Sequence, residues 1–247
     1  MHSTRSTIFF VLVMTTVVAL VLAFLFNGLK GTHERNEIVY NKKAILSAIE
    51  NELGESISDM SDDRAEEIFS TKIKQTVVTV AGDEVEESYI ENRYKGGKAE
   101  NIDLKKEKKL DEDEKILPVF EFNTDSGEKY YIASVRGSGL WDDIWGYIAL
   151  EDDLNTIAGV AFGHKGETPG LGAEIKDNED WKSQFKGKKL YDENGDWKSV
   201  YVRKGGAKNP IHEVDGISGA TITADGVTEM LDRGLKYYES YFKTLQG

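Results

Sequence analysis

The chain has 247 residues, a net charge of −13 and no cysteine. The absence of cysteine excludes disulfides, thiol catalysis and ligation of an iron–sulfur cluster by this chain alone. The excess of acidic residues argues against nucleic acid as a partner, because proteins bind nucleic acids by neutralising phosphates with Lys and Arg.

An apolar segment lies within the first 30 residues. Thr7 to Phe26 is an uncharged run of 20 residues rich in Val, Leu, Phe and Ile, the length needed to cross the core of a bilayer. A cleaved signal peptide is the alternative, but its apolar region is usually shorter and ends in a small-x-small site, and no such site follows Phe26. We therefore expect a tail at 1–6 and a transmembrane helix at 7–29. The flanking charges alone do not favour one orientation.

The region 30–116 is expected to form a membrane-proximal segment, and it contains no recognisable motif. Residues 34–50 carry an apolar stripe at helical spacing, and residues 75–80 are typical of a strand. Residues 103–115 mix acidic and basic side chains, a pattern typical of a solvated loop or an exposed helix. We expect this charged block to precede a second domain at 117–247.

Short strands and a closing helix are expected in this second domain. Two strand pairs are predicted by apolar and aromatic runs joined by turn residues: 119–122 with 130–135, and 147–150 with 157–162. The other expected elements are a helix at 173–186, a strand at 197–202 and a long helix after Thr221. Paired strands with separated helices indicate an α+β fold of antiparallel strands flanked by helices.

The most informative stretch is Asp-Gly-Ile-Ser-Gly-Ala-Thr, from Asp215 to Thr221. Its Gly-Ala pair leaves space beside the Thr221 hydroxyl, which lies at the predicted N-terminus of the closing helix. Unpaired N–H groups and the positive end of the helix dipole favour a phosphate there. The alternative is that a hydroxyl of this stretch, or that of Thr223, only caps the helix.

A second cluster lies at 163–172, between a predicted strand and a predicted helix. Its Gly and Pro residues are typical of a surface turn. In the alternative interpretation, Gly170 and Gly172 let the backbone approach a planar ligand, Thr168 bonds the ring heteroatoms and Leu171 packs on the ring.

A third cluster, at 137–146, contains Trp141 and Trp145. Such residues usually fill a core, but they can also flank an aromatic cofactor.

Together the three clusters resemble the covalent-FMN-binding family. This family includes the C subunit of the sodium-translocating NADH:quinone reductase and the G subunit of the Rnf complex. The resemblance covers roughly Pro118 to Thr244 together with the N-terminal anchor. The matching stretches are Gly139-Leu140-Trp141, Gly146-Tyr147, Glu151-Asp152-Asp153, 167–172, Lys204-Gly205-Gly206-Ala207 and 215–221. The segment between the anchor and Pro118 favours the quinone-reductase subunit, which is the longer of the two.

This resemblance implies that a flavin transferase couples FMN through its phosphate to the hydroxyl of Thr221, with Asp215 serving recognition during the transfer. It implies an electron carrier in a membrane complex that couples NADH oxidation and quinone reduction to sodium export. The other subunits are then its partners, and its soluble domain lies on the periplasmic side of a bacterial inner membrane. The residues expected near the flavin are Trp141, Trp145, Thr168, Gly170, Leu171, Gly172, Asp215, Ser218, Gly219 and Ala220.

No motif points to a catalytic or metal site on this chain. Neither a Gly-x-Gly-x-x-Gly turn after a strand nor a phosphate-binding loop is present, so we expect no NADH site here. The four His residues lack metal-ligand spacing. Two alternatives stay open. One is the related Rnf-type protein, which couples ferredoxin and NAD. The other is a non-redox, membrane-anchored assembly or binding module in which Thr221 only caps the helix.

Overall fold

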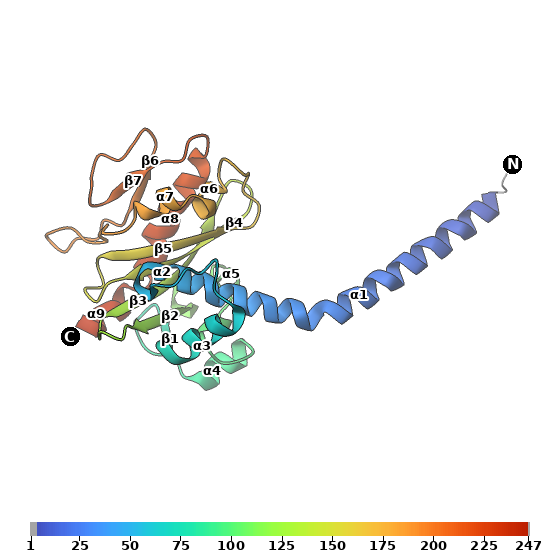
Figure 1. Cartoon of the computed structure of the whole chain (residues 1–247), viewed down its shortest axis with the longest axis horizontal. Helices are drawn as coiled ribbons and strands as arrows, with labels where there is room; N and C mark the ends of the chain where they lie inside the picture. The colour runs from blue at the N-terminus through green and yellow to red at the C-terminus, as the bar shows by residue number, and fades with distance from the viewer. Residues whose placement is uncertain (1–3, 247) are drawn as a thin grey trace. The chain divides into compact units, whose positions relative to one another are not determined.

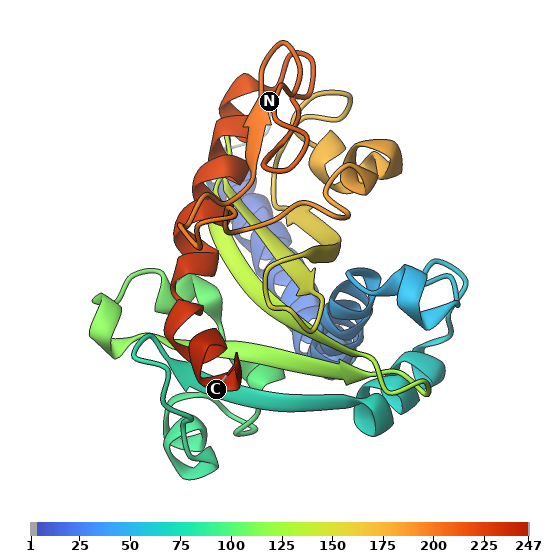
Figure 2. The ribbon, with the colours of Figure 1, turned by 90° about the vertical axis from the view of Figure 1, so that its left-hand side faces the viewer.

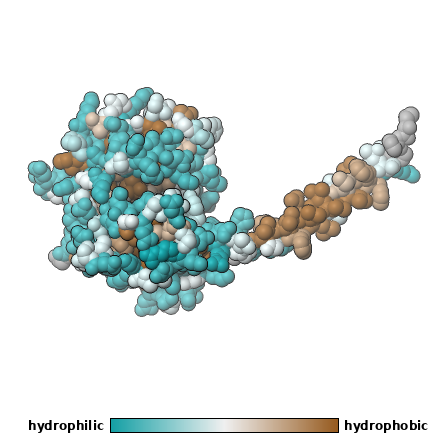
Figure 3. All heavy atoms as spheres, in the orientation of Figure 1, coloured by the Kyte–Doolittle hydropathy of each residue, from teal (hydrophilic) through white to brown (hydrophobic). Residues whose placement is uncertain are grey.

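The computed structural model describes residues 4–246, and the chain divides between Tyr40 and Asn41 into two compact units. The N-terminal unit is the first part of helix α1 (Thr4–Ser47). Large apolar side chains are exposed along this part (Figure 3), and α1 is long and apolar enough to cross a membrane. It contains the span predicted at 7–29. Of the predicted tail, residues 1–3 lie outside the described residues.

The second unit is built on a five-stranded antiparallel sheet (Figure 1) in which each strand pairs with the next along the chain. Its strands are β1 (Ile73–Thr79), β2 (Ile116–Asn123), β3 (Lys129–Ser138), β4 (Asp143–Leu150) and β5 (Ile157–His164). The two strand pairs predicted from the sequence are confirmed. The predicted α+β class with antiparallel strands is also confirmed, because helices flank this sheet.

The two faces of the sheet carry separate apolar cores, because successive side chains of a strand point to opposite faces. On β3, Ala133 and Val135 join the core that includes the buried face of α8 (Thr221–Lys236), whereas Ile132 joins the other core. Figure 2 shows α8 running along the sheet.

The other elements are α2 (Glu50–Leu53), α3 (Asp62–Lys72), α4 (Glu87–Arg93), α5 (Leu104–Glu107), α6 (Glu174–Asp177), α7 (Glu179–Ser183), α9 (Glu239–Gln246), the 3-10 helices Ala99–Asn101 and Glu112–Glu114, and the parallel strands β6 (Tyr201–Arg203) and β7 (Glu213–Asp215).

Tyr238, between α8 and α9, occupies a gap between β2 and β3. The regular ladder ends at the pair Val119 and Ala133, and the next pair would be Pro118 and Ser134. Pro118 has no N–H to donate. The Tyr238 hydroxyl substitutes for this missing N–H group. Its oxygen lies 2.7 Å from the Ser134 carbonyl oxygen and 3.2 Å from the Pro118 carbonyl oxygen. It also accepts a hydrogen bond from the Ser134 N–H at 3.2 Å. Beyond this point the two strands separate.

Replacing Tyr238 with Phe is therefore expected to destabilise the protein. The side chain is fully buried, so losing its hydroxyl leaves the backbone groups of Ser134 without a partner, at a cost of about 1–3 kcal/mol. Urea denaturation of the full chain measures this loss. Tyr89→Phe, at an exposed tyrosine, is the matched control and should change stability by less than about 0.5 kcal/mol. Equal stabilities of the two variants would contradict this role of Tyr238.

The expectation that the charged block 103–115 is solvated is wrong for two buried residues, Lys115 and Glu107. This carboxylate is 1% exposed, pairs with Arg93 at 2.9 Å and accepts hydrogen bonds from the Tyr94 hydroxyl and the Ile116 N–H. Its three partners compensate the burial of the charge.

Other elements differ from the sequence predictions in extent. Strand β1, from the predicted membrane-proximal segment, pairs with β2, so the sheet extends across the predicted boundary between residues 116 and 117. The helix predicted at 173–186 is present as two short helices, and the strand predicted at 197–202 is limited to β6.

Candidate cofactor site

A cavity of about 240 Å³ lies at the N-terminus of α8. Three segments that are distant in the sequence line it: the loop after β3, the loop after β5, and the turn before α8 together with the first turn of that helix. The lining residues are Leu140, Glu167, Thr168, Leu171, Gly172, Gly219, Ala220, Thr221, Ile222 and Thr223. Six of the residues predicted from the sequence are therefore brought together here: Thr168, Leu171, Gly172, Gly219, Ala220 and Thr221.

Thr221 begins α8, and its side chain is exposed. The preceding residue, Ala220, occupies the N-cap position and supplies no side-chain acceptor. Within residues 4–246 no side-chain hydrogen bond caps the first turn of α8, so the interpretation of a hydroxyl as a simple helix cap is not supported. The first N–H groups of the helix and the Thr221 hydroxyl are left available to a ligand, which is the arrangement that favours an anion.

The turn before Thr221 depends on a glycine. Gly219 has a φ of +75°, a conformation that L side chains rarely adopt. A Cβ placed on Gly219 would also lie 2.5 Å from Cδ2 of Leu171. The turn and the loop after β5 therefore approach each other closely.

Glu167 joins the three lining segments, and its role was not predicted from the sequence. It is 5% exposed, and its carboxylate accepts hydrogen bonds from the Trp141 N–H at 3.0 Å and the Thr223 hydroxyl at 2.5 Å. A Cβ on Gly172 would collide with this carboxylate, so Gly172 is needed for close packing. An isolated Glu in a polar loop carries no sequence signal of burial, and only the folded contacts identify it.

Exposed apolar side chains surround the cavity. Leu140, Leu171 and Ile222 line it and are 47%, 40% and 57% exposed. Trp141, adjacent to Leu140, is 69% exposed. Exposed apolar groups gathered at one place mark an interaction site, and a flat aromatic group is the kind of ligand that such side chains cover. An apolar rim beside an uncapped helix N-terminus fits a ligand with both a ring and a phosphate.

The structure does not bring Trp145 to this cavity. On β4, Ile144 belongs to the core beneath α8, so the side chain of Trp145, the next residue, points to the other face of the sheet. There it packs over Gly163, and the Arg136 guanidinium lies 5.5 Å from its ring centroid. The role of Trp145 beside a flavin remains a prediction without support from this geometry.

Asp215, Ser218 and Gly170 lie outside the cavity lining. The Asp215 carboxylate accepts a hydrogen bond from the Ala207 N–H at 2.7 Å, and its backbone carbonyl accepts one from the indole of Trp181 at 2.6 Å. Asp215 thus connects the Lys204–Ala207 turn to the end of β7.

Glu213 accepts hydrogen bonds from backbone groups of the same loop, and its contribution to the stability of the folded protein depends on pH. Hydrogen bonds from the backbone N–H groups of Asn209 and Lys208, and then from Arg203, lower the pKa of Glu213 from 4.5 to about 2. Because the pKa of Glu213 is lower in the folded state, its ionised carboxylate stabilises the folded protein above pH 4.5. This contribution to the free energy of unfolding is lost as the pH falls toward 2. Glu213→Gln is therefore expected to lower stability at pH 7, with a difference from the parent that narrows below pH 4.5. Urea denaturation at several pH values measures this; a pH-independent difference would contradict it.

Known proteins resemble this chain in sequence. The sequence profile of the FMN-binding domain matches residues 139–236. The chain is 34% identical to the C subunit of the Na(+)-translocating NADH-quinone reductase of Pseudomonas aeruginosa, over 93% of this chain and 90% of the relative. It is 31% identical to the protein of the same name from Vibrio vulnificus, with the same coverage.

Solved structures share the fold as well. The C subunit of the Na(+)-translocating NADH-quinone reductase from Parabacteroides distasonis superposes with a TM-score of 0.73 and 37% identity, covering 87% of this chain and 96% of that one. The NqrC protein of Shewanella oneidensis superposes with a TM-score of 0.68 and 25% identity, covering 87% and 99%.

Proposed function

Because the chain belongs to the family of the C subunit of the Na(+)-translocating NADH-quinone reductase, and is thus a flavin electron-carrier subunit, we propose that its FMN is joined to the Thr221 hydroxyl by a phosphoester bond. The observation that carries this proposal is the exposed hydroxyl at an uncapped helix N-terminus, inside the residues matched by the FMN-binding profile. Bound FMN supplies the redox chemistry, and the protein supplies attachment, position and electrostatics.

Each part of the cavity has a role in this proposal. The first N–H groups of α8 stabilise the phosphate. Leu140, Leu171 and Ile222 cover the ring, and Thr168 bonds its heteroatoms. Glu167 contacts no ligand in this scheme; it holds the loops of Trp141 and Gly172 against the start of α8.

Asp215 acts during maturation in this proposal. Its side chain is exposed, so a flavin transferase can reach it together with Thr221. Ser218, also exposed, belongs to the same recognition sequence.

The proposed setting is a bacterial inner membrane. Helix α1 anchors the chain, and the globular unit lies on the periplasmic side. There it passes electrons between other subunits of a complex that oxidises NADH, reduces quinone and exports sodium ions. NADH binds elsewhere in the complex. The names of the relatives favour the quinone reductase over the Rnf complex.

The proposal is tested by producing the full chain with and without a flavin transferase. We expect the co-expressed chain to be yellow, with a flavin absorbance that bleaches on reduction by dithionite and returns in air. A colourless chain, obtained while the transferase modifies a known acceptor in the same cells, would instead favour a non-redox assembly or binding module.

A further inference from the structure

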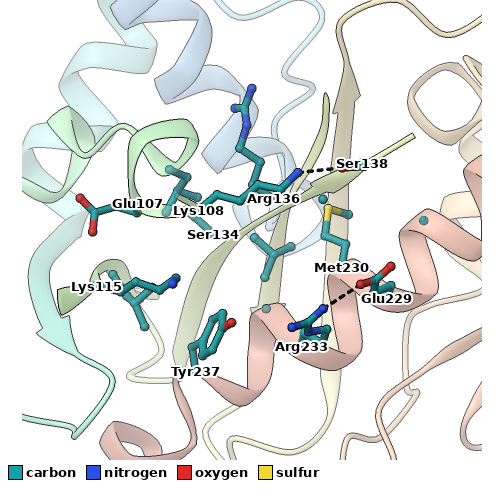
Figure 4. Close-up of a pocket in the computed structure, with 16 residues that line it drawn as sticks. Glu107, Lys108, Lys115, Ser134, Arg136, Ser138, Glu229, Met230, Arg233 and Tyr237 are labelled. Atoms are coloured by element: carbon teal, nitrogen blue, oxygen red, sulfur yellow. Dashed lines mark hydrogen bonds and ion pairs between the residues drawn. The ribbon is translucent and has the colours of Figure 1, made fainter. Parts of the chain in front are cut away.

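A second cavity of about 240 Å³ lies on the flank of α8, and no residue lines both this cavity and the cofactor cavity. It opens where β2 and β3 separate beyond the Tyr238 hydroxyl. Residues from α5, β2, β3 and α8 line it (Figure 4). The gap in the sheet therefore opens this cavity, whose lining is separate from that of the cofactor cavity.

Lys115 lies immediately before β2 and has no acidic partner among the described residues. It is 7% exposed, and within residues 4–246 no carboxylate oxygen lies within 4.0 Å of its ammonium. The ammonium donates to the Leu110 carbonyl and lies 5.6 Å from the ring centroid of Tyr237. Figure 4 shows it directed toward Tyr237 and the centre of the cavity. A buried charge is costly unless a counter-charge accompanies it.

The other cations of the lining have carboxylate partners. Lys108 lies 3.4 Å and Arg136 lies 3.0 Å from Asp143, and Arg233 lies 3.0 Å from Glu229. Lys108 and Arg136 share the one carboxylate of Asp143, and Lys115 is the lining cation for which the described residues provide no carboxylate partner, on a chain whose net charge is −13.

Part of the remaining wall is apolar. Its apolar residues are Leu104, Leu117, Val135, Met230 and the Tyr237 ring, whereas Ser134, Ser138 and the carboxylates of Glu107 and Glu229 supply the polar part of the lining. The volume is below the 300–1,000 Å³ of typical drug-sized ligand sites, so the ligand is smaller than these.

We propose that this cavity binds a small organic anion, a carboxylate or phosphate on an apolar body, with the anionic group on the Lys115 ammonium and the body against Val135, Met230 and Tyr237. Such a ligand supplies the missing counter-charge and removes apolar surface from water in one step. The same chemistry is offered by a soluble metabolite and by the headgroup region of an anionic lipid. The proposal does not depend on the flavin.

The test uses the full chain without FMN in a neutral detergent, observed by ¹⁹F NMR. The probes are 4-fluorobenzoate and 4-fluorophenyl phosphate, with neutral 4-fluorobenzyl alcohol as the uncharged control. Lys115→Met keeps the length of the side chain and removes its charge. Lys109→Met, at an exposed lysine outside the cavity lining, is the matched control. Thermal unfolding verifies that both variants fold.

We expect at least one anionic probe to bind, and Lys115→Met to weaken it roughly tenfold to a hundredfold, the range for a hydrogen bond to a charged group. Lys109→Met should leave binding unchanged. Displacement of the probe by phosphatidylglycerol bicelles but not by phosphatidylcholine bicelles assigns a lipid source; displacement by soluble acids alone assigns a metabolite. The proposal is overturned if neither anion binds, if the alcohol binds as tightly, or if Lys115→Met binds as the parent does.

Discussion

Replacing Thr221 with Ala is expected to give a folded chain that carries no covalent FMN. The substitution removes the only atom of this side chain that can form a phosphoester. The helix boundary does not depend on this hydroxyl, since no side-chain bond caps the first turn of α8 within the described residues. Stability should therefore change by less than about 0.5 kcal/mol, as for other surface substitutions. Flavin fluorescence of the denatured protein in a gel measures the covalent fraction, and thermal unfolding verifies the fold.

Two variants serve as controls for this result. Thr221→Ser retains a hydroxyl at the same position and should keep covalent FMN. Ser218→Ala removes an exposed hydroxyl that lies outside the cavity lining, and it should leave the Thr221 acceptor intact. Covalent flavin on Thr221→Ala would show that another residue is the acceptor.

Replacing Glu167 with Ala is expected to damage both stability and flavin loading. The change leaves the Trp141 N–H and the buried Thr223 hydroxyl without their acceptor and opens a void beside Gly172. The loss of these two hydrogen bonds, one of them from the buried Thr223 hydroxyl, costs about 2–4 kcal/mol together. Because the three loops of the cavity share this carboxylate, the covalent FMN fraction should fall severalfold even in chains that remain folded.

Chemical denaturation and the FMN-to-protein ratio measure these two effects separately. Glu167→Gln keeps an acceptor for Trp141 and should be less damaging than Glu167→Ala. Glu193→Ala, in an exposed turn, is the matched control and should leave both quantities unchanged. Equal effects of Glu193→Ala and Glu167→Ala would contradict a specific role for Glu167.

The strands and the closing helix could be predicted because their signals are local. Alternating or continuous apolar runs identified β2 to β5, and the residues buried on α8, among them Val227, Met230, Leu231 and Leu235, recur at the three- and four-residue spacing of a helix. The Gly-Ala-Thr stretch likewise placed Thr221 at a helix N-terminus. The alternation on β4 also contained the information that Trp145 faces away from Ile144, although the tryptophan pair was interpreted as one unit.

Features that depend on distant contacts could not be predicted in this way. The burial of Glu107 requires Arg93 and Tyr94, and that of Glu167 requires Trp141 and Thr223. Their local sequences are polar and indicate solvent. The role of the Tyr238 hydroxyl follows from the missing N–H of Pro118, a residue 120 positions earlier in the chain. In each case the partner is supplied by the fold.

The central claim is tested most directly by the intact mass of the full chain made with and without a flavin transferase, followed by peptide mapping. The account predicts a mass gain equal to FMN minus water, located on the peptide that contains Thr221. No gain, with the transferase active on a known acceptor, or a gain located on a different residue, would contradict it.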